Sequence, residues 1–112
     1  MSSSPEYVAF VAEQLAGVGE ITYRKMFGEY GIYCDGILFG CVCDNRFFVK
    51  ITDPGREFMP NGVTAPPYAG AKPYFLIEDL DDPEFLRELT QITCAALPAK
   101  RPNRRARRTT LG

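Results

Sequence analysis

The chain has 112 residues, of which 46% are hydrophobic and 24% charged, so it fits one domain that builds its core without disulfides or metals. No apolar run approaches the ~18–20 residues of a membrane span, and the N-terminus lacks signal-peptide features, so we expect a cytoplasmic protein. The net charge of −1 hides an acidic body and a basic C-terminal tail.

The first predicted helix covers about residues 5–16. Ser4 offers an N-cap hydroxyl, Pro5 suits the first turn and Glu6 is favourable beside the positive end of the helix dipole. Apolar residues at helical spacing follow, and Gly17 stands where a helix commonly ends.

Three β-runs come next, at Thr22–Phe27, Tyr30–Cys34 and Ile37–Cys43. Asp35-Gly36 between the last two predicts a type I′ hairpin. A regular hairpin with this loop places Gly31 opposite Gly40 and Ile32 opposite Phe39. One face, which we expect to be the core face, then holds Tyr30, Ile32, Cys34, Ile37, Phe39, Cys41 and Cys43.

A further strand is predicted at Phe47–Ile51, after a three-residue loop at 44–46. A two-residue loop on the regular register would bury Arg46 and Lys50, whereas three residues bury Phe47, Val49 and Ile51. The opposite face then exposes an apolar set that we expect to form a homodimer interface or a docking surface for a protein partner. This set is Tyr33, Leu38, Val42 and Phe48.

The second half of the sequence is rich in proline and glycine as far as Lys72. A short helix is expected from Asp53 to Phe58, followed by a long loop and a strand at Tyr74–Glu78. Asp82-Pro83-Glu84 predicts the start of a last helix, which Pro98 ends. The predicted fold is two-layer α+β, with a mostly antiparallel sheet and helices packed on one face.

The domain is expected to span residues 1–98 and to be followed by a basic, flexible tail at 99–112. Residues 100–108 carry six of the thirteen basic side chains, which leaves seven basic against fourteen acidic in the rest. The tail is either a solvated end or a nonspecific contact for nucleic acid, although no aromatic residue there offers a base-stacking platform. The contacting residues would be Arg101, Arg104, Arg105, Arg107 and Arg108.

Neither a metal site nor a catalytic centre is predicted. The chain has no histidine, and its four cysteines form no C-x-x-C pair, so they are interpreted as buried free thiols in a reducing compartment. The acidic run at 78–82 lacks calcium-loop spacing and is explained by helix capping. We therefore expect no enzyme, no cofactor and no small-molecule substrate. A thiol-dependent enzyme would need an exposed cysteine of depressed pKa.

The segment from Tyr23 to Gly36, YRKMFGEYGIYCDG, resembles the N-terminal domain of the TfoX/Sxy competence regulators. The strands FFVKITD, from Phe47, and PYFLI, from Pro73, are similar to later strands of that family, and the resemblance covers about residues 5–97. The positions that match the family pattern are Met26, Phe27, Gly28, Gly31, Tyr33, Gly36 and Lys50.

The resemblance implies a small antiparallel-sheet domain found in regulators of bacterial DNA uptake, and it supplies no catalytic residues. The expected function is a non-enzymatic regulatory or protein-interaction module whose partner belongs to the transcription machinery or is a second copy. The alternative is a nucleic-acid-binding accessory protein that acts through the arginine-rich tail.

Overall fold

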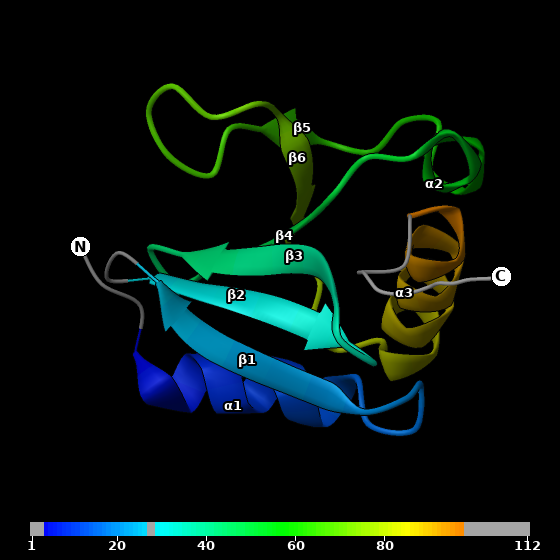
Figure 1. The fold of residues 1–112 in the computed structure, drawn as a ribbon. Helices are drawn as coiled ribbons and strands as arrows, with labels where there is room; N and C mark the ends of the chain where they lie inside the picture. Colours follow the sequence, from blue (N-terminus) through cyan, green and yellow to red (C-terminus); the bar gives the residue numbers. More distant parts are fainter. Residues whose placement is uncertain (1–3, 27–28, 98–112) are drawn as a thin grey trace, which may run out of the picture.

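The computed structural model describes residues 4–26 and 29–97 (Figure 1). The predicted helix starts are confirmed, and the strands lie within one or two residues of their expected positions. No helix in these two ranges is both long and apolar enough to cross a membrane. The elements are α1 (Pro5–Gln14), β1 (Ile21–Met26), β2 (Glu29–Cys34), β3 (Ile37–Cys43), β4 (Arg46–Val49), α2 (Asp53–Phe58), β5 (Thr64–Ala65), β6 (Tyr74–Ile77) and α3 (Pro83–Ala96).

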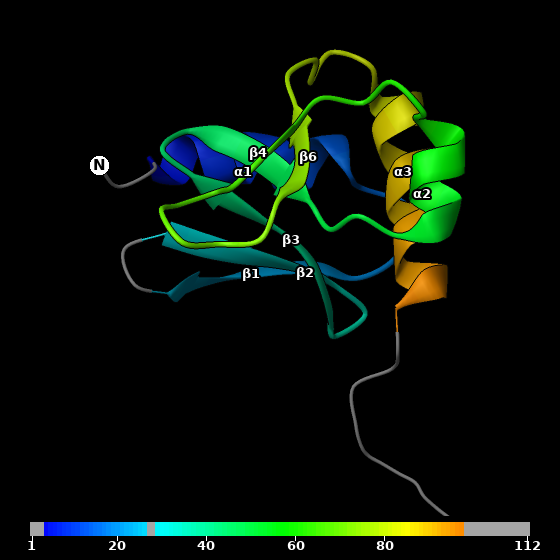
Figure 2. The same ribbon diagram turned by 90° about the horizontal axis from the view of Figure 1, so that it is seen from above.

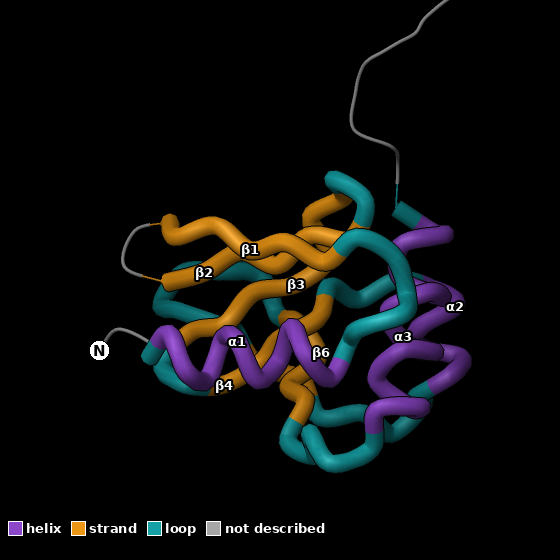
Figure 3. Tube along the Cα trace, turned by 90° about the horizontal axis from the view of Figure 1, so that it is seen from below, coloured by secondary structure: helices purple, strands orange, loops and turns teal. Residues whose placement is uncertain are grey.

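The strands form one antiparallel sheet in the order β1-β2-β3-β4-β6-β5. The first four strands follow chain order, and β6 lies beside β4 (Figure 2). The short strand β5 then pairs with the other edge of β6. Helix α1 runs along one face of the sheet, α3 stands at one end of it, and α2 packs against α3 (Figure 3). The predicted α+β class is confirmed.

Each helix begins at a side-chain cap followed by proline in the first turn. The Ser4 hydroxyl accepts from the Tyr7 amide at 3.2 Å, and the Asp82 carboxylate accepts from the Phe85 amide at 3.2 Å. Thr52 caps α2 in the same way. Because these caps satisfy amides that lack a helical partner, the helix starts are set by local sequence.

The core lies between the sheet, α1 and α3. Its largest fully buried side chains are aromatic and come from β3, β4 and β6, and Phe39 meets Phe47 edge-on with ring centroids 6.4 Å apart. Outside this cluster, the rings of Phe58 and Phe85 stack at 5.5 Å and join α2 to α3. The buried cluster contains Val8, Val11, Leu15, Ile32, Cys34, Phe39, Val42, Phe47, Val49, Phe75, Ile77, Leu86 and Leu89.

The β2–β3 hairpin contains a bulge that the regular register did not predict. The turn is as expected, since Asp35 and Gly36 both have positive φ, at 51° and 83°. Beyond it, Tyr33 pairs with Leu38 but Ile32 pairs with Gly40, so Phe39 is an extra residue. The predicted pairs of Gly31 with Gly40 and of Ile32 with Phe39 are therefore wrong.

The bulge exchanges the two faces of the second half of β3. Val42, predicted on the outer face, is buried in the core cluster. Cys41 and Cys43, predicted on the core face, lie on the outer face, because Cys41 pairs with Phe48 and Cys43 with Arg46. One inserted residue changes the side of every side chain that follows it in the strand.

The β3–β4 connection is a two-residue turn, and the predicted three-residue loop is wrong. Asp44 and Asn45 both have positive φ, at 55° and 54°, and Cys43 pairs directly with Arg46. Because the bulge has already moved Cys43 outward, this short turn leaves Arg46 exposed and Phe47 in the core. The expected burial of Phe47 and Val49 is confirmed by a different route.

The long loop expected after α2 instead includes a short strand and folds over the outer face of the sheet. Thr64 and Ala65 form β5, and the Leu76 amide donates to the Val63 carbonyl at 2.8 Å. The segment 66–72 continues above β3 in Figure 1, with Pro67 buried. The outer face is thus partly covered by its own chain.

The exposed apolar surface predicted on this face is only partly present. Phe48 is fully buried, with the Arg46 guanidinium 5.2 Å from its ring centroid, and Val42 belongs to the core. Tyr33 and Leu38 remain half-buried. The predicted four-residue interface is therefore wrong for Val42 and Phe48.

Candidate functional site

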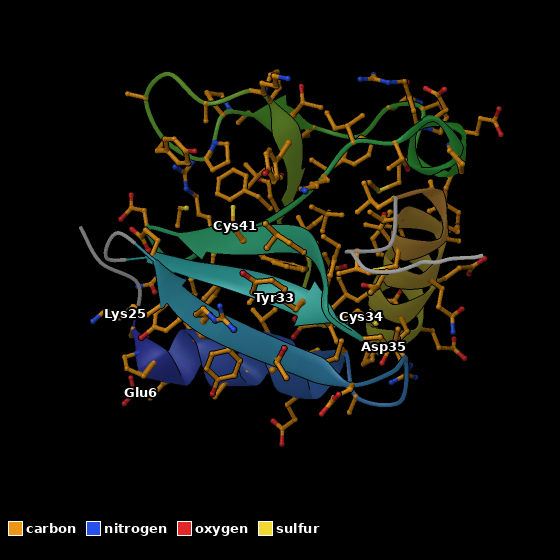
Figure 4. All side chains as sticks on the ribbon, in the orientation of Figure 1. Glu6, Lys25, Tyr33, Cys34, Asp35 and Cys41 are labelled. Atoms are coloured by element: carbon orange, nitrogen blue, oxygen red, sulfur yellow. The ribbon has the colours of Figure 1, made fainter. Side chains whose placement is uncertain are left out.

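A pocket of about 600 Å³ lies between the outer face of the sheet and the segment 66–72. Strands β2 and β3 form its floor, while Tyr68 and Tyr74 form part of its wall. Figure 4 places Cys41 on the side of β3 that faces this segment, away from α1. The lining residues are Glu29, Tyr30, Leu38, Gly40, Cys41, Cys43, Tyr68 and Tyr74.

Cys41 and Cys43 form a thiol pair on the floor of this pocket. They are two apart in β3, so their side chains share a face, and the Cys43 thiol donates to the Cys41 Sγ at 3.9 Å. Burial is the main cause that raises the pKa of both thiols. For Cys41 the adjacent Cys43 and then Glu29 raise the pKa further, while Lys50 opposes the shift.

The wall of the pocket brings two tyrosines close to these thiols. Burial raises the pKa of Tyr74, and the nearby Cys41, Tyr68 and Cys43 add to the effect. Tyr68 projects from its loop with 66% of its surface exposed. The pocket therefore combines two thiols, whose burial favours the protonated form, with phenol rings and few charges.

A second thiol pair, Cys34 with Cys94, lies at the opposite end of β2, where the sheet meets α3. Burial raises the pKa of Cys34, and it raises that of Cys94 to about 12, with Cys34 itself and then Asp35 contributing. Cys34 and Cys43 are each 4% exposed, whereas Cys41 and Cys94 are partly exposed. All four cysteines are free thiols, and burial opposes the ionisation that a nucleophile needs.

Strand β1 is the six-residue edge of the sheet, and four successive residues, 22–25, are exposed. The Asp35 amide donates to the Glu20 carbonyl at 2.9 Å, which places the backbone groups of Glu20 toward β2. By strand alternation, the backbone amides of Tyr23 and Lys25 point away from the sheet. The sequence predicted this strand but gave no signal that it would lie at the edge.

The half-buried Tyr33 lies under a side chain of β1. The Arg24 guanidinium is 5.7 Å from the centroid of the Tyr33 ring, a distance suited to a cation–π contact. Both residues line a second hollow of about 320 Å³, together with Thr22, Tyr23 and Gly36. Two of the residues that match the predicted family pattern, Tyr33 and Gly36, thus lie beside the exposed edge strand.

The other residues of that pattern have structural positions or fall outside the described ranges. Gly31 is buried and pairs with Arg24 and with Cys41, and the Lys50 amide donates to the Phe39 carbonyl at 2.8 Å, beside the bulge. Met26 ends β1. Phe27 and Gly28 lie outside the described residues.

Comparison with known protein families identifies the domain that most of this chain forms. The model of the family described as the TfoX N-terminal domain matches residues 13–97. The chain belongs to the TfoX N-terminal domain family. The resemblance in the sequence is thereby confirmed, and the matched range contains every strand of the sheet and the whole of α2 and α3.

One relative with a similar sequence is an uncharacterized 12.7 kDa protein in the trpE 5′ region of Spirochaeta aurantia. It is 41% identical over 106 residues, which cover 93% of this chain and 91% of that protein. Similarity over nearly the whole of both chains shows that this TfoX-type domain occurs at closely similar length in another protein.

The remaining predicted sites fall outside the described part of the TfoX-type chain. The five tail arginines lie in the segment 98–112, which the structure does not describe. Within residues 4–26 and 29–97, no three His, Cys, Asp or Glu side chains are placed to hold a metal ion together. Among the described residues, the candidate binding features are therefore the thiol-lined pocket and the exposed edge strand β1.

Proposed function

We propose that this TfoX-type domain is a non-enzymatic regulatory module that works by binding a protein partner in the cytoplasm. Membership of a family named for a competence regulator supports the regulatory role. Free thiols are typical of a reducing compartment, which supports the location. The single observation that carries the binding role is the exposed edge strand β1.

An edge strand of six residues is a template for main-chain pairing. The outward amides of Tyr23 and Lys25 can donate to an extended segment of a partner, which then adds a seventh strand beside β1. At the other edge β5 has only two residues and offers much less backbone. The β1 edge is therefore the better site for strand addition.

The side chains of β1 select which chain can pair there. Arg24 and Lys25 are exposed on the strand, and basic residues on an edge disfavour pairing with an identical basic edge. They favour an extended segment with acidic residues. Tyr23, 44% exposed, adds an aromatic surface and contacts Tyr30 edge-on with centroids 6.0 Å apart.

The thiol environments support a non-enzymatic role. Thiol catalysis requires a thiolate near neutral pH, and burial raises the pKa of all four cysteines. The chain contains no histidine that could act as the base of a nucleophilic pair. We therefore assign the pocket a binding role rather than a catalytic one.

The decisive experiment removes one outward amide of β1. Tyr23→Pro deletes the donor at a position that does not bond to β2, so the sheet is retained while strand addition is lost. Tyr23→Ala is the matched control, because it removes the same ring but keeps the amide. Tagged wild-type and variant chains are used to recover partners from the native host, and each candidate is then purified and titrated directly.

The proposal requires a partner that binds wild type and Tyr23→Ala but binds Tyr23→Pro at least tenfold more weakly. Equal binding by all three chains would contradict strand addition at β1. Recovery of nucleic acid alone, lost when the chain is truncated after Leu97, would favour the tail-dependent alternative. A dimer by light scattering that Tyr23→Pro dissociates would identify the partner as a second copy.

A further inference from the structure

The thiol pair on the pocket floor has a geometry that a single soft atom can bridge. Cys41 and Cys43 extend from the same face of β3, and their sulfurs are 3.9 Å apart. An atom bound to both at the ~2.3 Å typical of metal–thiolate bonds would subtend an S–X–S angle of roughly 115°. This angle is close to that of a planar three-coordinate centre and does not suit a linear two-coordinate one. A pyramidal three-coordinate centre has a narrower angle and needs the two sulfurs to move slightly closer together.

The centre that fits this pair brings its third ligand with it. No third His, Cys, Asp or Glu side chain in the described ranges joins the two thiols as a metal-binding group. The space above the sulfurs is instead the 600 Å³ pocket, with Leu38, Tyr68 and Tyr74 among its lining residues. These walls fit an organic substituent better than they fit a bare, hydrated ion.

We propose that Cys41 and Cys43 form a capture site for a soft, thiophilic centre that brings one ligand of its own, either monosubstituted trivalent arsenic or a cuprous ion with an exogenous ligand. Paired sulfur ligands select soft acceptors over hard cations such as magnesium or calcium. The pocket receives the third ligand while the two sulfurs hold the centre. This binding role is independent of the β1 edge and of the protein partner proposed above.

Capture proceeds without oxidation or reduction. With phenylarsine oxide, two As–S bonds form, the bonds from arsenic to oxygen break, and the two thiol protons leave with that oxygen as one water molecule. Arsenic stays trivalent. With a cuprous ion, two Cu–S bonds replace two bonds to its carrier ligands, the thiol protons pass to solvent, and copper stays monovalent.

The first test uses phenylarsine oxide as the probe and intact-mass spectrometry as the readout. One equivalent, added to the reduced full-length protein in thiol-free buffer under nitrogen, should give a single 1:1 adduct. Cys41→Ser and Cys43→Ser should each lower the apparent affinity at least tenfold. Cys94→Ser is the matched control, because it breaks the other thiol pair, at the α3 end, and should bind like wild type.

Several outcomes would overturn the proposal. They are the absence of a 1:1 adduct on the folded wild type, full binding by Cys41→Ser, and loss of binding in Cys94→Ser. If the nearly buried Cys43 cannot be changed without unfolding, the partly exposed Cys41 decides alone, with circular dichroism confirming that its variant is folded.

The second test separates the two soft centres. The protein is titrated with a cuprous ion held by a competing chelator of known affinity, and the same three variants are compared. If only the arsenical binds in a manner that depends on Cys41, the site requires a centre with an organic third ligand. If both probes bind in this manner, the site accepts soft, thiophilic centres in general. Failure of both probes at Cys41 rejects the site.

Discussion

The two faces of the sheet bury large aromatic residues equally well but by different means. Phe39 on the inner face and Phe48 on the outer face are both fully buried. Phe39 packs in the cluster formed with α1 and α3, whereas Phe48 lies between Cys41 of β3 and Leu76 of β6, with the Arg46 guanidinium over its ring.

The two kinds of cover suit the two faces to different roles, the inner face to stability and the outer face to binding. On the inner face, side chains of α1 and α3 join those of the strands in one buried cluster. The outer face is covered by a loop, and the space that the loop leaves is the 600 Å³ pocket. A helix-covered face contributes mainly to the free energy of unfolding, while a loop-covered face keeps room for a ligand at lower cost in packing. The following predictions test that division.

The largest expected effect is on the inner face. Phe39→Ala removes a fully buried ring and should lower the free energy of unfolding by about 3–5 kcal/mol, measured by urea denaturation. Leu38→Ala, the adjacent position on the outer face, is the control and should cost less than half as much, because Leu38 is only half-buried. Equal losses would show that the two faces contribute alike.

A substitution at Gly40 tests how much the bulge in β3 contributes to stability. A Cβ atom there would lie far inside van der Waals contact of the Phe48 carbonyl oxygen, a backbone atom that cannot easily move. Gly40→Ala should therefore destabilise the protein by about 1–3 kcal/mol. The control is Gly36→Asn, which keeps a left-handed turn position and should cost much less. A neutral Gly40→Ala would mean that β3 can pair without its bulge.

Alkaline pH should destabilise the protein through thiols at both ends of the sheet. The folded chain keeps thiol protons that the unfolded chain loses above about pH 8.5, since burial raises the pKa of all four cysteines. The free energy of unfolding should fall as pH rises, by at most ~1.4 kcal/mol per pH unit for each thiol. Urea titrations at pH 7.5–10 measure the slope.

Single variants show which thiol pair causes the decline of the free energy of unfolding with pH. Cys94→Ser and Cys41→Ser should each make the decline shallower, the first at the helix-packed end and the second in the pocket. An unchanged slope in both variants would show that these thiols do not ionise differently in the folded and unfolded chains.

The smallest effect on stability is expected in the segment 66–72, which covers the pocket. Tyr68→Ala should change the free energy of unfolding by less than about 0.5 kcal/mol, because most of this ring is exposed. The same variant should accelerate alkylation of Cys41 by iodoacetamide, since it opens the pocket, and leave labelling of Cys94 unchanged. A large loss of stability would show that the loop contributes as much as a helix does.

Local signals in the sequence predicted the parts of the fold that depend on local chemistry. Ser4 and Asp82 predicted the helix starts, and Asp35-Gly36 predicted the hairpin turn, because each acts through neighbours a few residues away. The order of the predicted helices and strands predicted the α+β class. These features needed no knowledge of the packed core.

The bulge at Phe39 could not be predicted from alternation, and the errors in the candidate site follow from it. A regular hairpin and the observed one bury similar numbers of apolar residues, because Cys41 and Val42 are both acceptable inside a core. In the observed register Gly40 lies so close to the Phe48 carbonyl oxygen that a side chain there would clash, and alternation does not reveal this contact between strands. The thiol pocket and the β1 edge therefore required the structure.

The insertion of β6 between β4 and β5 sets the order in which the chain can fold as it is synthesised. Strands β1 to β4 form successive hairpins that can pair as soon as residue 49 is available, but β4 gains its second neighbour only when residues 74–77 arrive. Until then the nascent sheet presents the apolar edge Phe47–Val49 to its surroundings. The edge stays unpaired until about 25 further residues have emerged. Slower emergence of residues 50–73 from the ribosome should therefore increase aggregation, whereas slower emergence of the residues after Ile77 should have no such effect.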